Sequence, residues 1–162
     1  MRKKTLFMTQ ASMIASLYVI LTLFANMLGL ANMAIQVRFS ESLTILPFFT
    51  PAAVPGLFIG CIISNLLIGS MPMDIIFGSI ATLLGAMGTR LLKKNQWLAP
   101  VPPIITNMII VPWILKTVYQ FEGSYFYFMV TVGIGQVISC GFLGMLVLFA
   151  LKKRSDIFKI TE

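Results

Sequence analysis

The sequence predicts an all-α integral membrane protein with six transmembrane helices and both termini in the cytosol. Of its 162 residues, 58% are hydrophobic and only 10% are charged, whereas a soluble domain carries about 25% charged residues. The mean hydropathy is +0.94. Long apolar stretches recur along the chain, and short connections rich in Gly and Pro separate them.

The distribution of Lys and Arg predicts the orientation. The chain has 12 of these residues, and only Arg38 and Lys116 fall outside the two terminal segments and the stretch of residues 90–94 at the end of the fourth span. Cytosolic connections carry an excess of Lys and Arg. An even number of spans therefore places both termini in the cytosol. The net charge of +7 reflects this bias, and nucleic acid is not an expected partner.

The first span is predicted at residues 6–28. It follows three basic residues, as a signal peptide would, but the apolar run is too long for a signal-peptide core. We therefore interpret it as a retained helix. Ala11 and Ala15 lie on one face of it, and two small residues at this spacing let another helix approach closely. That helix belongs either to this chain or to a partner protein.

Five further spans follow, and Pro or Gly marks most of their ends. They are predicted at residues 37–50, 56–69, 73–92, 104–118 and 126–151. The second is short for a hydrocarbon core of about 30 Å, and it stops at Pro47 and Pro51 because proline removes a backbone donor. The third contains Gly56 and Gly60, which form another close-packing face.

The last three spans carry polar or basic residues near their ends. Asp74 begins the fourth span, where a carboxylate favours the dipole of the helix N-terminus. Trp97, in the connection to the fifth span, is predicted to anchor at the membrane interface. The sixth span is followed by Lys152, Lys153 and Arg154. Because no long linker interrupts the series, we predict one membrane domain over residues 1–162.

Arg38 and Glu41 are two opposite charges inside the second span. An ionisable side chain at bilayer depth costs about 2.5–3.5 kcal/mol on insertion scales. Three residues are nearly one helical turn, so both head groups lie on one face. Two explanations remain open: the charges satisfy each other in an ion pair, or they form one wall of a solute pocket.

Other polar residues favour a pocket that opens outward. The candidate substrate-binding residues are Glu41, Arg38, Asn107, Asp74, Gln136, Asn65 and Trp113. Polar residues inside membranes usually face a bundle interior or a cavity, and these fall in the outer half or the middle of the predicted spans. Structural alternatives exist: hydrogen bonds between helices for the two amides Asn107 and Gln136, a helix cap for Asp74, and interface anchoring for Trp113.

Several functional classes are not expected. The sequence has no phosphate-binding loop of the G-x-x-x-x-G-K-[ST] type, no HExxH motif and no histidine. Its two cysteines lie in apolar runs and are interpreted as packing thiols. No enzyme activity, cofactor or metal site is therefore predicted. A small membrane protein with a pocket but no energy site is typical of a capture subunit that depends on partners.

Three segments resemble the QueT family. They are IQVRFSESLTILP at residues 35–47, PGLFIGCIISN at residues 55–65 and DIIFGSIATL at residues 74–83. The family comprises substrate-binding S components of energy-coupling factor (ECF) transporters. The resemblance implies capture of a queuosine precursor, such as 7-cyano- or 7-aminomethyl-7-deazaguanine, or of queuine.

The resemblance also implies partners and roles. S components work with a transmembrane coupling protein and two cytosolic ATPases. Ala11 and Ala15 are similar to the motif by which S components dock on the coupling protein, and Glu41 matches the family's acidic position. The alternatives are an S component for thiamine or riboflavin, and a structural membrane subunit that binds no solute.

Overall fold

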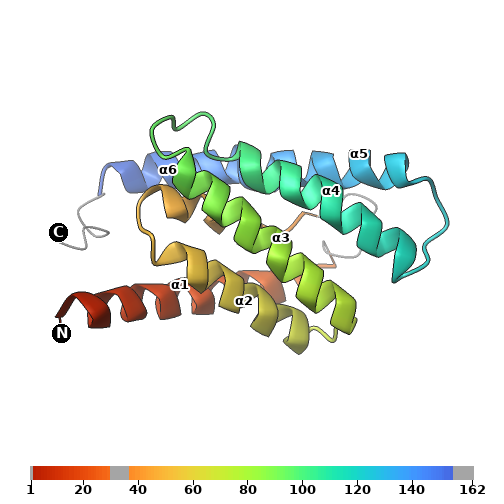
Figure 1. The fold of residues 1–162 in the computed structure, drawn as a ribbon, viewed down its shortest axis with the longest axis horizontal. Helices are drawn as coiled ribbons and strands as arrows, with labels where there is room; N and C mark the ends of the chain where they lie inside the picture. The colour runs from red at the N-terminus through yellow and green to blue at the C-terminus, as the bar shows by residue number, and fades with distance from the viewer. Residues whose placement is uncertain (1, 30–36, 155–162) are drawn as a thin grey trace.

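The computed structural model describes residues 2–29 and 37–154, and every regular element in them is helical. The order is α1 (Arg2–Met27), η2 (Phe39–Phe48), α2 (Ala53–Leu67), α3 (Pro72–Leu91), α4 (Val101–Thr117), α5 (Tyr125–Gln136), η3 (Val137–Leu143) and α6 (Gly144–Lys152). The helices run roughly along the long axis of one bundle (Figure 1). The predicted all-α class is confirmed. Most of the predicted first connection (30–36) and the polar tail (155–162) lie outside the described residues.

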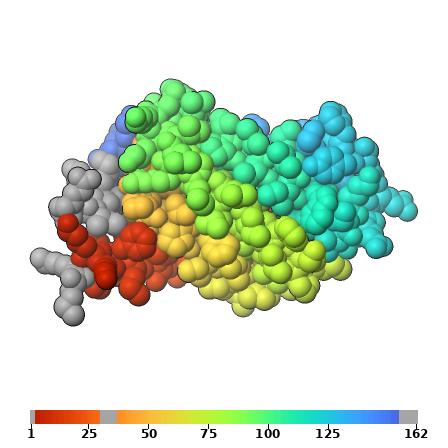
Figure 2. All heavy atoms as spheres, viewed as in Figure 1, coloured from red at the N-terminus to blue at the C-terminus, as the bar shows by residue number. Residues whose placement is uncertain are grey.

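The surface has the character of a membrane protein. Three described helices are long and apolar enough to cross a bilayer, namely Lys3–Met27, Pro72–Leu91 and Tyr125–Lys152. Helices α2, α3 and α4 lie side by side and form one face of the molecule (Figures 1 and 2). Large apolar side chains are exposed on all three: Ile59, Ile63, Ile76, Leu84, Ile105 and Ile109. Hydrocarbon accepts such a surface, whereas water would favour its association.

The second predicted span differs from the expectation of a helix over residues 37–50. It is the 3₁₀ helix η2, in which every residue from Ser40 to Pro47 is buried. At about 2 Å per residue its ten residues extend about 20 Å, less than the hydrocarbon thickness. The hydroxyls of Ser42 and Thr44 each donate to the carbonyl three residues earlier, at 2.6 Å. These local bonds and the internal Pro47 favour the tighter helix.

Helices α1 and α2 approach each other closely through the small residues noted in the sequence. A Cβ built on Gly56 would lie 2.7 Å from the carbonyl oxygen of Ala11, and one on Gly60 would lie 2.9 Å from Cβ of Tyr18 and 3.0 Å from the carbonyl oxygen of Ala15. The faces of Ala11 and Ala15 and of the two glycines therefore meet within this chain. This is the internal alternative left open above, and it brings Tyr18 toward the centre of the bundle.

The last apolar span is continuous from Tyr125 to Lys152, but its middle is the π-helical segment η3. Such segments are rare inside α-helices and often occur at functional sites. Ser139 and Cys140 of η3 are buried against η2, since the Ser139 hydroxyl accepts the backbone N–H of Arg38 at 3.2 Å. The span thus presents polar side chains to the central 3₁₀ helix.

Candidate functional site

Glu41 lies at the centre of a buried set of polar side chains. Only 1% of its surface is exposed. The Tyr18 hydroxyl donates to its Oε1 at 2.7 Å, and Nδ2 of Asn107 donates to its Oε2 at 3.4 Å. A buried carboxylate requires such partners, because burying an unpaired charge is very unfavourable. Elements α1, η2 and α4 therefore meet at this one carboxylate.

The network continues from α4 to η3. Nδ2 of Asn107 also donates to Oε1 of Gln136 at 3.4 Å, and the Cys140 thiol donates to the same oxygen at 3.1 Å. The Thr44 hydroxyl oxygen of η2 lies 3.4 Å from Sγ of Cys140. We call Tyr18, Glu41, Asn107, Gln136 and Cys140 the central polar cluster. Both bonds from Asn107 are longer than the usual 2.9–3.0 Å, so this amide is the cluster member most easily rearranged around a guest.

Arg38 does not pair with Glu41 in the described part of the chain. The bonds of the carboxylate go to Tyr18 and Asn107, and the bond recorded for Arg38 is that of its backbone N–H to Ser139. The ion pair considered from the sequence is therefore absent from the described residues. The positive charge of Arg38 still interacts electrostatically with the carboxylates of Asp74 and Glu41.

Asp74 and Asn65 form a second polar cluster. A Cβ built on Gly78 would lie 3.3 Å from Oδ1 of Asp74 and 3.6 Å from Nδ2 of Asn65, so both side chains lie over this glycine. Both are also buried. The Tyr119 hydroxyl donates to Oδ2 of Asp74 at 3.0 Å and accepts the backbone N–H of Met71 at 3.4 Å. Asp74 is thus more than a helix cap, because it joins α3 to the connection that follows α4.

The Tyr119–Asp74 contact predicts a pH dependence. Partial burial raises the pKa of Tyr119 above its ordinary value of 10.0, and the nearby Asp74 charge raises it further. Because the folded-state pKa is the higher one, the contribution of Tyr119 to stability is complete below about pH 10 and declines as the pH rises through the folded-state pKa. Difference titration of phenolate absorbance between the chain and Tyr119→Phe should show one tyrosine ionising above pH 10. Ionisation at or below pH 10 would contradict the contact.

Trp113 lies apart from both clusters. Its ring meets Phe77 edge-on with centroids 5.1 Å apart, and 41% of its surface is exposed. This position agrees with the interface-anchoring alternative, and no bond to either cluster is recorded for it. Its role as a substrate-binding residue stays a prediction.

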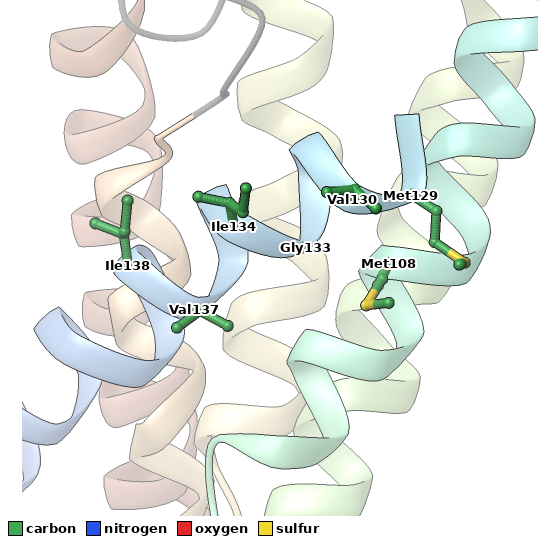
Figure 3. A pocket seen from close by; sticks show the side chains of 7 residues that line it. All are labelled: Met108, Met129, Val130, Gly133, Ile134, Val137 and Ile138. Carbon is green, nitrogen blue, oxygen red and sulfur yellow. The ribbon is translucent and has the colours of Figure 1, made fainter. Parts of the chain in front are cut away.

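An apolar pocket of about 370 Å³ lies between α4 and the α5–η3 span (Figure 3). Met108 faces Gly133 across it, where a Cβ would lie 3.1 Å from the Met108 sulfur. The remaining lining residues are Met129, Val130, Ile134, Val137 and Ile138. With no polar side chain, this pocket offers nothing to orient a polar heterocycle, so the central polar cluster remains the better candidate.

Sequence reasoning missed two members of the central cluster. Tyr18 was included in a continuous apolar run, although its hydroxyl is a polar group at bilayer depth and therefore needs a partner. Cys140 was interpreted as a packing thiol, yet it contacts both Gln136 and Thr44. The hydroxyl was a usable signal in the sequence. Nothing in the sequence predicted the π-helical turn that positions the thiol.

An apolar helical bundle that gathers a carboxylate and several amides in its interior is a membrane protein of the transporter type, since such groups in membranes mark solute and ion pathways. The family model for the QueT transporter matches residues 8–153. The chain therefore belongs to the QueT transporter family. This is a family of transporters, so the expectation that the protein is not an enzyme is confirmed.

One curated relative is similar over part of the chain. It is the queuosine precursor transporter QueT of Lactococcus lactis subsp. cremoris (strain MG1363), which is 35% identical over 82 residues. The aligned region covers 51% of this chain and 48% of the relative, so the match spans about half the length of that protein. No solved structure matches this one.

Proposed function

We propose that this protein is the substrate-capture subunit of an ATP-driven ECF importer and binds a queuosine precursor from outside the cell. The observation that carries the proposal is the buried carboxylate of Glu41, held by Tyr18 and Asn107 in the middle of an apolar bundle. Membership in the QueT transporter family supports it, as does the similarity to a relative that is named a queuosine precursor transporter.

The central polar cluster offers the chemistry that a 7-deazaguanine requires. The ring presents two parallel N–H donors on its 2-amino-pyrimidinone edge. A carboxylate has about four lone-pair positions, of which Tyr18 and Asn107 use two, so Glu41 retains one on each oxygen for this edge. Charge-assisted pairs of this kind are among the stronger hydrogen bonds.

Side chains near Glu41 are the proposed hydrogen-bond partners for the other polar atoms of the ring. The amides of Asn107 and Gln136 both donate and accept. Arginine pairs with guanine through two hydrogen bonds, to O6 and N7. A 7-deazaguanine has carbon at position 7 and offers only the carbonyl oxygen, so we propose that Arg38 donates to that oxygen. Asp74 and Asn65 would lie toward the substituent at position 7. A carboxylate there favours a cationic aminomethyl group.

The proposed importer supplies energy through partners, namely a transmembrane coupling protein and two cytosolic ATPases, with both termini of this chain in the cytosol. Ala11 and Ala15 are the proposed docking residues. They border a groove of about 470 Å³ between α1 and α2 that also includes Ser12, Ser16 and Ile59. Small side chains there allow a helix of the coupling protein to approach, even though the pair also packs on α2 in this chain.

Calorimetry on the purified chain tests the proposal. The ligands are 7-cyano-7-deazaguanine, 7-aminomethyl-7-deazaguanine, queuine, thiamine and riboflavin. We expect binding to at least one 7-deazaguanine and none to the two vitamins. If the chain binds only thiamine or riboflavin, the proposed substrate is wrong but the proposed role as an S component remains. A folded chain that binds none of the five would overturn the proposal and favour a structural subunit.

A further inference from the structure

A further groove lies on the surface, and neither polar cluster contributes a side chain to it. Helix α1 and the η3–α6 span flank η2, and the space between them forms a groove of about 880 Å³ with η2 as its floor. Its walls are apolar: Met13 and Leu17 on one side, Leu146 and Ala150 on the other. The groove is therefore suited to a hydrocarbon chain.

The polar atoms that border the groove are already engaged. Oε1 of Gln10 accepts the Thr50 hydroxyl at 2.8 Å, and the Ser42 hydroxyl donates to the Phe39 carbonyl at 2.6 Å. Gln10 and Ser42 are the two polar residues among those that line the groove, so hydrogen bonds contribute little along its length. Its apolar walls are open, since Met13 is 67% exposed and Leu146 is 53% exposed, so contact with hydrocarbon is the main source of affinity along its length.

The length of the groove matches a lipid. On α1 it extends from Gln10 to Phe24, which is about 21 Å at 1.5 Å per residue. One leaflet of a bilayer contributes about half of the 30 Å hydrocarbon thickness. An acyl chain of one leaflet therefore fits within the groove.

One end of the groove carries a group of exposed basic side chains in the described part of the chain. The beginning of α1 and the end of α6 lie at the same end of the bundle (Figure 1). There, Lys3 and Lys4 precede the groove, and Lys153 and Arg154 follow Leu151, its last lining residue. All four side chains are exposed, and the first turn of α1 contains no acidic residue. This end offers a concentrated positive charge to an anionic head group.

We propose that this groove is a binding site for an anionic phospholipid. The acyl chains lie against α1, η2 and α6, and the phosphate lies among Lys3, Lys4, Lys153 and Arg154. Apolar walls explain why a lipid enters, and the basic end explains why an anionic one is preferred. A basic residue near an anionic head group contributes about a fivefold change in affinity.

Native mass spectrometry of the full chain in detergent tests this, with phosphatidylglycerol and phosphatidylcholine of identical acyl chains as probes. We expect one tightly bound phosphatidylglycerol, preferred over phosphatidylcholine by at least about 25-fold, since two basic residues alone give that ratio. In the double variant Lys153→Gln/Arg154→Gln, the affinity for phosphatidylglycerol should fall about 25-fold, and the affinity for phosphatidylcholine should not change. The matched variant Lys93→Gln/Lys94→Gln, which removes two exposed charges after α3, should change nothing.

A second pair of variants tests the groove itself. Leu146→Trp fills it and should weaken both lipids, whereas Ile76→Trp adds the same bulk on α3 at an equal exposure of 53% and should not. Equal retention of the two lipids would overturn the proposal. Preference for phosphatidylglycerol that is retained in Lys153→Gln/Arg154→Gln would also overturn it, as would lipid binding that Leu146→Trp does not change. Thermal unfolding of each variant verifies that it is folded.

Discussion

Replacing Glu41 by Gln is expected to reduce the affinity for a 7-deazaguanine at least about 100-fold while the chain remains folded. A neutral amide has one acceptor oxygen, and its NH₂ group opposes a ligand N–H, so the pair of parallel bonds cannot form. A hydrogen bond to a charged group contributes about 1.5–3 kcal/mol, and 1.4 kcal/mol is a factor of ten in affinity. Calorimetry measures the loss, and circular dichroism checks the helices.

Two further variants make this result specific. Glu122→Gln is the same substitution at an exposed carboxylate in the connection before α5, and it should leave the affinity unchanged. Tyr18→Phe removes the 2.7 Å bond to Glu41 but leaves the carboxylate, so we expect an intermediate loss of about tenfold for one such bond. Retained affinity in Glu41→Gln, or an equal loss in Glu122→Gln, would show that Glu41 does not bind the substrate.

The helical class and the importance of the second span could be predicted because both follow from composition. Hydrocarbon penalises an isolated charge, so Glu41 and its amide neighbours had to be enclosed, and the structure does bury Glu41, Asn107 and Gln136. The partners could not be predicted. Arg38 lies three positions before Glu41, yet the carboxylate bonds to Tyr18 and Asn107, which lie 23 and 66 positions away.

Backbone geometry explains most of what sequence patterns missed. A periodicity argument treats an apolar run as an α-helix, so neither the 3₁₀ helix η2 nor the π-helical η3 was anticipated. Both depend on tertiary contacts, such as that of the Arg90 guanidinium with the Pro47 carbonyl at 3.2 Å at the end of η2. The polar residues of the second cluster were recognised singly, but their convergence over Gly78 required the packing of α3 on α2.

Gly60→Ala is expected to destabilise the protein and weaken substrate binding together. The new methyl group would lie 2.9 Å from Cβ of Tyr18 and 3.0 Å from the Ala15 carbonyl oxygen. These atoms belong to or adjoin the α1 backbone, so the helices must separate, and overpacking of this kind costs about 1–3 kcal/mol. The gain in helix propensity from Gly to Ala is at most about 1 kcal/mol, so the clash is the larger effect. The unfolding temperature should therefore fall by several degrees, since each kcal/mol corresponds to about 2–4 °C.

The link to binding arises because the same clash displaces Tyr18 from Glu41. Gly141→Ala is the matched control, since a Cβ there would have neighbours no closer than 3.7 Å, an ordinary contact distance. We expect Gly141→Ala to keep both its unfolding temperature and its affinity. Should Gly60→Ala unfold at a lower temperature yet bind normally, Tyr18 would not be holding the carboxylate for the substrate. Equal stability of the two variants would instead show that α1 and α2 are less tightly packed than the contact between Gly60 and Ala15 requires.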